Sequence, residues 1–107
     1  MSVCGYLYTP SHAPLPEQEL AWLKLRGADP ILHDWGSRTY LEELFRRITA
    51  GWVQEVLLLR LADLGDRADE IHERLLQLQH SGIRLSLVTE SGLQARAGGG
   101  GWRPTRG

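Results

Sequence analysis

Short apolar runs alternate with amphipathic stretches along most of this chain. The run Val56 to Leu59 is apolar at every position, which is typical of a strand buried on both faces in the middle of a parallel sheet. Residues 83–88 place apolar side chains at every second position, as in a half-buried strand nearer an edge. Two other runs are rich in side chains that favour strands. We therefore expect four strands, at residues 3–8, 31–33, 56–59 and 83–88.

Three stretches between these strands have the apolar spacing of helices. Glutamates follow Pro16 at the start of the first, and Thr39 with Glu42 forms a possible capping box at the start of the second. Acidic residues begin the third, where the helix dipole favours negative charge. Each stretch stops at a glycine. The predicted helices lie between Pro16 and Gly27, between Thr39 and Gly51, and between Asp66 and Gly82.

The alternation of strand and helix defines the expected fold class. Each helix must cover the sheet that its own strands join, which implies right-handed crossovers and helices on both faces. We expect a three-layer α/β sandwich with a mainly parallel four-stranded sheet. A chain of 107 residues has room for one such domain, which we place at residues 1–90. Residues 91–107 are rich in glycine and arginine, and we expect a flexible tail there.

Charge is distributed unevenly along the chain. Of 12 basic and 13 acidic residues, three arginines and no acid fall after residue 93. The domain is therefore acidic, and a phosphate backbone would repel it. Any contact with DNA would depend on the tail, where Trp102 lies among Arg96, Arg103 and Arg106 and could touch nucleic acid or a partner.

The remaining composition points to a soluble cytoplasmic protein without a membrane partner. Cys4 is the sole cysteine, which excludes an internal disulfide and fits a reducing compartment. Apolar runs are far shorter than the roughly 20 residues that span a bilayer. The histidines have neither the i, i+4 pairing nor the cysteine neighbours of a zinc site, and we expect no cofactor.

Several short motifs follow one another in a recognisable order. The segment after the third strand reads Arg60-Leu61-Ala62-Asp63-Leu64-Gly65-Asp66. The other motifs are Gly5-Tyr6 in the first strand, Gln18, Leu23 and Gly27 around the first helix, Ser37-Arg38 with Leu41 at the second, and Gly82-Ile83 with Thr89-Glu90 around the last strand.

Together these motifs resemble the catalytic domain of the serine recombinases, the family of resolvases and DNA invertases. The resemblance covers about residues 3–90 and implies a resolvase-like fold with flavodoxin-like topology. The family pattern after the third strand is basic-Leu-Asp-Arg-Leu-Gly-Arg. This chain has Ala62, Asp63 and Asp66 where the family has an acid and two arginines.

In that family a serine at the end of the first strand attacks a DNA phosphate, and arginines stabilise the growing negative charge. A serine hydroxyl is a weak nucleophile, so this reaction depends on those cations. Here Tyr8 stands in place of the first-strand arginine and Pro10 in place of the nucleophile. Thr9 and Ser11 are each one position away, which reverses the direction of a side chain at a strand end.

Three hypotheses about function follow. The preferred one is a degenerate resolvase-like domain that no longer cleaves DNA and binds a protein partner, such as an active recombinase or a second copy of itself. The second is a recombinase with a relocated site, using Ser11 or Thr9 with Arg38 and Arg60. The third is a phosphate-binding domain that holds Mg²⁺ through Asp34, Asp63 and Asp66.

Overall fold

The computed structural model describes residues 2–88 and 94–96. Strands and helices alternate along the described chain, with one 3₁₀ turn, labelled η1, after the third strand. The elements are β1 (Val3–Thr9), α1 (Glu17–Leu25), β2 (Ile31–Trp35), α2 (Thr39–Thr49), β3 (Glu55–Leu58), η1 (Leu61–Leu64), α3 (Ala68–Ser81), β4 (Arg84–Val88) and β5 (Gln94–Arg96).

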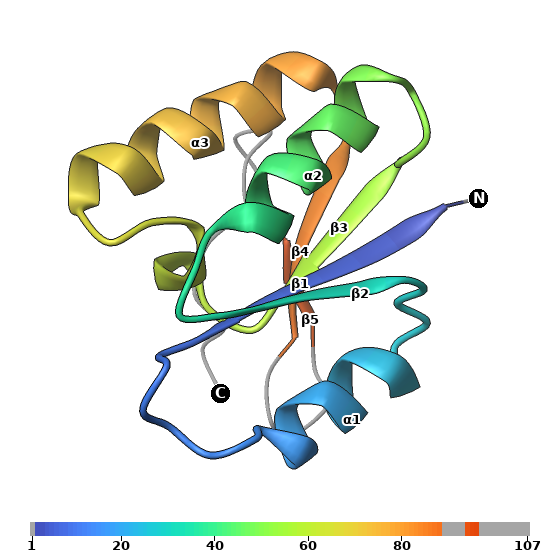
Figure 1. The fold of residues 1–107 in the computed structure, drawn as a ribbon. Helices are drawn as coiled ribbons and strands as arrows, with labels where there is room; N and C mark the ends of the chain where they lie inside the picture. The colour runs from blue at the N-terminus through green and yellow to red at the C-terminus, as the bar shows by residue number, and fades with distance from the viewer. Residues whose placement is uncertain (1, 89–93, 97–107) are drawn as a thin grey trace.

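The strands form one sheet in the order β2-β1-β3-β4-β5. The first four are parallel, and β5 is antiparallel to β4. Figure 1 shows α2 and α3 on one face of the sheet and α1 on the other. The three-layer α/β fold, its parallel four-stranded sheet and its flavodoxin-like strand order are therefore confirmed, with β3 central as its apolar sequence predicts.

Two apolar clusters, one on each face of the sheet, hold the layers together. Successive side chains of a strand point to opposite faces, and β3 divides accordingly. Val56 and Leu58 pack in the cluster that includes the buried leucines of α2 and α3. Leu57 packs in the cluster that includes Leu23 of α1. A strand that is apolar throughout is thus required because both of its faces are covered.

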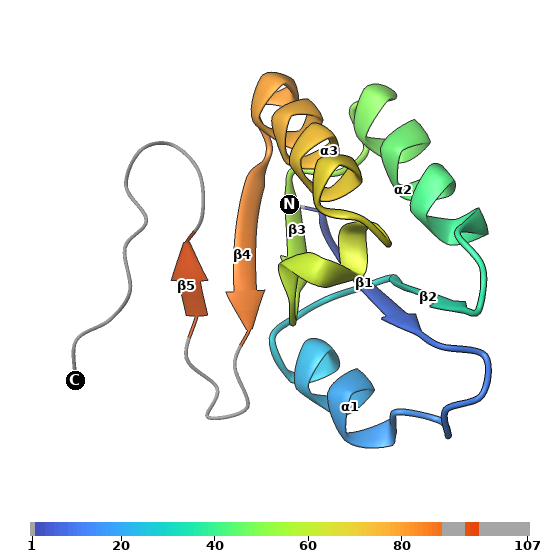
Figure 2. The same cartoon turned by 90° about the vertical axis from the view of Figure 1, so that its left-hand side faces the viewer.

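The structure corrects several sequence-based boundaries. β2 continues through Asp34 to Trp35, beyond the predicted end at residue 33. The third helix begins at Ala68, two residues after Asp66. Residues 94–96, which we assigned to a flexible tail, pair with β4 as β5 (Figure 2). The other residues of that expected tail lie outside the described part of the chain. No described helix is long and apolar enough to cross a membrane.

Candidate functional site at the carboxyl edge of the sheet

The carboxyl ends of β1, β2 and β3 meet at one edge of the sheet, which we call the carboxyl edge. β1 and β2 are parallel neighbours, and so are β1 and β3. Side chains that follow these strands therefore gather in one region, as is usual for ligand sites in parallel sheets. The gathered segments are the proline-rich loop after Thr9, the turn from Gly36 to Arg38, and Arg60 with η1.

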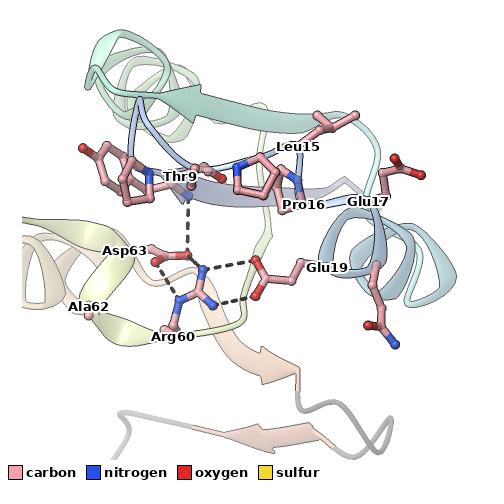
Figure 3. A pocket seen from close by; sticks show the side chains of 13 residues that line it. Thr9, Leu15, Pro16, Glu17, Glu19, Arg60, Ala62 and Asp63 are labelled. Carbon is pink, nitrogen blue, oxygen red and sulfur yellow. Dashed lines mark hydrogen bonds and ion pairs between the residues drawn. The ribbon is translucent and has the colours of Figure 1, made fainter.

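Arg60 links α1 to η1 through two carboxylates (Figure 3). Its Nη1 and Nη2 atoms lie 2.8 and 3.3 Å from the carboxylate oxygens of Glu19, and its Nε and Nη2 atoms lie 3.0 and 3.3 Å from those of Asp63. The hydrogen bonds with Glu19, followed by those with Asp63, raise the pKa of Arg60 despite its partial burial. Both acidic partners come from this chain, so Arg60 serves here as a structural cation.

Asp63 is the buried member of this cluster, with 4% of its surface exposed. Besides the contacts with Arg60 it accepts a hydrogen bond from the backbone N–H of Tyr8 at 3.4 Å. Burial raises the pKa of Asp63, while Arg60 acts in the opposite direction. Ala62, its exposed neighbour, belongs to the same turn.

Arg38 lies beside the Tyr8 ring and reaches η1. Its guanidinium carbon is 3.8 Å from the centre of that ring, which is a cation–π contact. Its Nη2 atom is 2.8 Å from Asp66 Oδ1, and its Nη1 atom donates to the backbone carbonyl of Asp63 and to the Tyr6 hydroxyl. Burial lowers the pKa of Arg38, but the hydrogen bonds with Asp66 and Tyr6 outweigh it, and the net shift is upward.

Asp34 anchors the start of α2. Its carboxylate accepts hydrogen bonds from the backbone N–H groups of Tyr40 and Leu41 at 2.8 and 3.0 Å, and from the Tyr6 hydroxyl at 2.7 Å. The predicted capping box of Thr39 is therefore wrong: Thr39 is already inside the helix, and no side chain of the adjoining residues caps it. The buried Asp34 does this from β2 instead.

The three candidate magnesium ligands have separate partners. Asp34 binds the start of α2, Asp63 pairs with Arg60, and Asp66 pairs with Arg38. Within residues 2–88 and 94–96, no group of three or more His, Cys, Asp or Glu side chains could hold a metal ion. This arrangement does not support the magnesium hypothesis.

One of the two candidate nucleophiles, Thr9, lines the same open pocket as Arg60. Thr9 is buried, and its Oγ1 atom is 2.9 Å from His33 Nε2. Ser11 is exposed and packs against Gly36, where a Cβ atom would come within 2.6 Å of the Ser11 Cβ. In the described part of the chain no hydrogen bond joins either hydroxyl to Arg38 or Arg60. Pro10, at the family's nucleophile position, has no hydroxyl.

An open groove of about 780 Å³ runs along the carboxyl edge, and we call it the edge groove. One side is the loop after β1, with its three prolines, and the other is Arg60 with η1 (Figure 3). The two glutamates of the first turn of α1 also line it. Three acids and one arginine line it: Glu17, Glu19, Asp63 and Arg60. The charge of this lining is therefore negative.

Sequence reasoning missed Glu19 and Tyr6 as members of this edge. Glu19 is 41 residues away from Arg60, and its sequence context indicates only the start of a helix. Tyr6 had a detectable signal, since a tyrosine at a buried strand position needs a partner for its hydroxyl. That partner is Asp34, and burial together with this hydrogen bond raises the pKa of Tyr6.

Among solved structures, the chain resembles the crystal structure of a resolvase family site-specific recombinase from Streptococcus pneumoniae. The two chains are 19% identical, with a TM-score of 0.56, and the match covers 87% of this chain and 76% of the other. At this identity the similarity shows the fold alone, and it confirms that the fold is resolvase-like. No protein-family model matches the sequence, and no curated protein gives a significant match.

Proposed function

We propose that this chain is a resolvase-like domain that does not cleave DNA and acts by binding a protein partner. The observation that carries this proposal is the pairing of both arginines at the carboxyl edge with acids of the same chain. Arg60 is held by Glu19 and Asp63, and Arg38 is held by Asp66.

Phosphoryl transfer requires cations that face the reacting phosphate and stabilise charge as it develops. Here a phosphate would have to displace carboxylates that already satisfy the guanidinium groups. It would also lie close to Asp63 and Asp66, whose charge repels it. The edge therefore lacks the electrostatic support that the reaction needs.

Exposed apolar side chains around the same edge support the partner-binding half of the proposal. Leu15, Trp35 and Tyr40 are 48%, 43% and 49% exposed. Trp35 Nε1 donates to the Ala13 carbonyl at 3.2 Å, two residues before Leu15. Tyr40 lies in the first turn of α2, the helix that Asp34 caps. Exposed aromatic residues are enriched at protein interfaces. As the partner we propose an active recombinase, with a second copy of the chain as the alternative.

The first experiment incubates the purified full chain with supercoiled plasmid and looks for nicked or linear DNA and for protein covalently attached to it. We expect neither product at any protein concentration. A covalent adduct that disappears in the Ser11→Ala or Thr9→Ala variant would refute the proposal and establish the relocated-site recombinase instead.

The second experiment adds the chain to a recombination reaction run by an active resolvase-family recombinase from the same genome. We expect recombination to change with a saturable dependence on the chain, and the Tyr40→Ser variant to reduce this effect several-fold. Trp52→Ser is the matched control, because Trp52 is 63% exposed and precedes β3 at the opposite edge of the sheet. No effect of the wild-type chain, together with a monomeric chain in solution, would refute partner binding of either kind.

A further inference from the structure

Strand β2 is an open edge of the sheet. It stands first in the strand order and pairs with β1 alone (Figure 1). The N–H of Gly5 donates to the carbonyl of Pro30, and this bond fixes which residues of β2 face β1, because the direction alternates along a strand. The N–H and C=O groups of Ile31, His33 and Trp35 therefore point away from β1. Among the described residues, none of these backbone groups has a hydrogen-bond partner.

The sequence of this edge does not prevent pairing with another strand. Natural sheets protect an open edge with lysine, with proline or by keeping the edge strand very short. The outward residues of β2 include neither lysine nor proline. The opposite edge differs, because β5 has only three residues against five in β2. Of the two edges, β2 is therefore the one that offers a strand of ordinary length.

We propose that β2 pairs with β2 of a second copy of this chain, in an antiparallel and two-fold symmetric arrangement. His33 lies opposite its counterpart in the second copy, and Ile31 lies opposite Trp35 of that copy. The residues with outward backbone groups then face one another, so each pair exchanges both of its N–H···O=C hydrogen bonds. The two five-stranded sheets become one continuous sheet.

Three features favour a second copy over an unrelated strand. The outward residues are self-complementary, because the branched Ile31 faces the aromatic Trp35 at both ends of the pairing, and such cross-strand pairs stabilise sheets. None of the outward residues is an acid, a lysine or an arginine, so two copies of this strand do not repel each other. A two-fold arrangement also closes after two chains, whereas pairing of β2 with β5 of the next copy would continue into a filament.

The side chains beside this edge are already held in place. Ile31, His33 and Trp35 lie on the same face of the strand, since side chains alternate along it. The rings of His33 and Trp35 are stacked with their centres 5.6 Å apart, and the Trp35 indole donates to the Ala13 carbonyl at 3.2 Å. Trp35 is nevertheless 43% exposed. Pairing therefore covers an aromatic side chain that needs no reordering, which lowers the entropic cost of association.

This inference deepens the proposed function, because a second copy is one of the two partners named there, and its biological role rests on that function. The two proposals can nevertheless fail separately. A chain that dimerises through β2 and leaves recombination unchanged would support the pairing and contradict the recombinase as partner. A monomeric chain that alters recombination would do the reverse.

Sedimentation equilibrium of the full chain gives the first test, with two variants of one residue. At a chain concentration of about 100 µM we expect twice the mass of one chain. His33→Pro should sediment as a single chain, because proline has no N–H, and the fold tolerates it where an edge N–H points outward. His33→Ala loses the same side chain but keeps the N–H, and it should remain a dimer. A single-chain mass for the wild type up to about 200 µM, or equal dissociation of both variants, would overturn the inference.

Amide hydrogen exchange of the wild-type chain tests the pairing without any variant. On going from a dilute to a concentrated solution, exchange at the Ile31, His33 and Trp35 amides should slow at least about tenfold, because they gain hydrogen bonds only in the dimer. The amides of Leu32 and Asp34 point to β1 and should exchange slowly at both concentrations. Exchange that does not depend on concentration at the three outward amides would overturn the inference.

The register of the pairing is tested by NMR of a mixture of isotope-labelled and unlabelled chains. Nuclear Overhauser contacts between the two kinds of chain should join the Ile31 methyl groups of one copy to the Trp35 ring of the other. A dimer without this contact, or one in which β2 contacts β5 of the second copy, would contradict the symmetric arrangement.

Discussion

Removing the Arg60 side chain should destabilise the fold well beyond the effect of an ordinary surface ion pair. The side chain of Arg60 is 44% exposed, but that of Asp63 is only 5% exposed. In an Arg60→Ala variant the buried carboxylate would keep only the hydrogen bond from the Tyr8 N–H. Loss of one partner of a fully buried pair costs about 3–5 kcal/mol. Because Arg60 is partly exposed and solvent screens its interaction with Asp63, we expect the Arg60→Ala variant to lose about 2 kcal/mol of unfolding free energy.

Two further variants test whether the stability loss of Arg60→Ala comes from the buried carboxylate. Glu19→Ala leaves Arg60 paired with Asp63 and should cost about 0.5 kcal/mol. Arg67→Ala removes an ion pair whose two side chains are 73% and 70% exposed, and it should cost almost nothing. Urea unfolding of the three variants measures these free energies directly.

The pH dependence gives an independent check on the same reasoning. The folded-state pKa of Asp63 is already raised by burial, and loss of Arg60 removes the main influence that lowers it. A raised carboxyl pKa means that the folded chain binds the proton more tightly than the unfolded chain does. The deficit of Arg60→Ala should therefore shrink between about pH 7 and about pH 4.5. A loss equal to that of Arg67→Ala, or a deficit that does not change with pH, would refute the argument.

Three further predictions concern other parts of the fold. Burial lowers the pKa of His33, so protonation of this side chain favours unfolding and the chain loses stability as the pH falls. In urea titrations, His33→Gln should therefore lose less unfolding free energy than the wild type when the pH falls from about 7.5 to about 5.5. An equal loss in both would contradict this. Cys4 is fully buried, and burial raises its pKa to about 11. A thiol reagent should therefore modify Cys4 at least about 100-fold more slowly in the native chain than in the denatured chain. Similar rates would be inconsistent with burial. Gly36 and Gly82 both have φ near +80°, but only at Gly36 would an added Cβ atom collide with Ser11. In thermal unfolding, Gly36→Ala should therefore lose about 1 kcal/mol more stability than Gly82→Ala. Equal losses would show that the loop at Ser11 moves aside freely.

The sequence predicts the fold well because the fold depends on local patterns. The uniform apolar run at Val56 to Leu59 indicates a strand covered on both faces, and β3 is such a strand. Glycines mark the ends of the helices, and Gly82 has the positive φ expected there. The strand at residues 94–96 was missed because three residues in a polar, glycine-rich context carry no periodic signal.

The candidate site is less accessible to sequence reasoning because its contacts join distant segments. The Arg60–Glu19 pair and the Arg38–Asp66 pair connect residues 41 and 28 positions apart. Asp34 looked like a loop acid and a metal candidate, yet it is a buried cap because β2 runs two residues further than its apolar pattern indicates. What the sequence did indicate was the excess of acid over arginine near η1.

The central claim is that Arg38 and Arg60 are occupied by acids of the chain and do not bind phosphate. NMR of the arginine Nε–H groups tests it directly, by titrating the full chain with a short DNA duplex at about 0.15 M salt, where nonspecific attraction is largely screened. We expect the Nε–H signals of Arg38 and Arg60 to keep their positions throughout the titration. Movement of both signals to a saturable end point would contradict it.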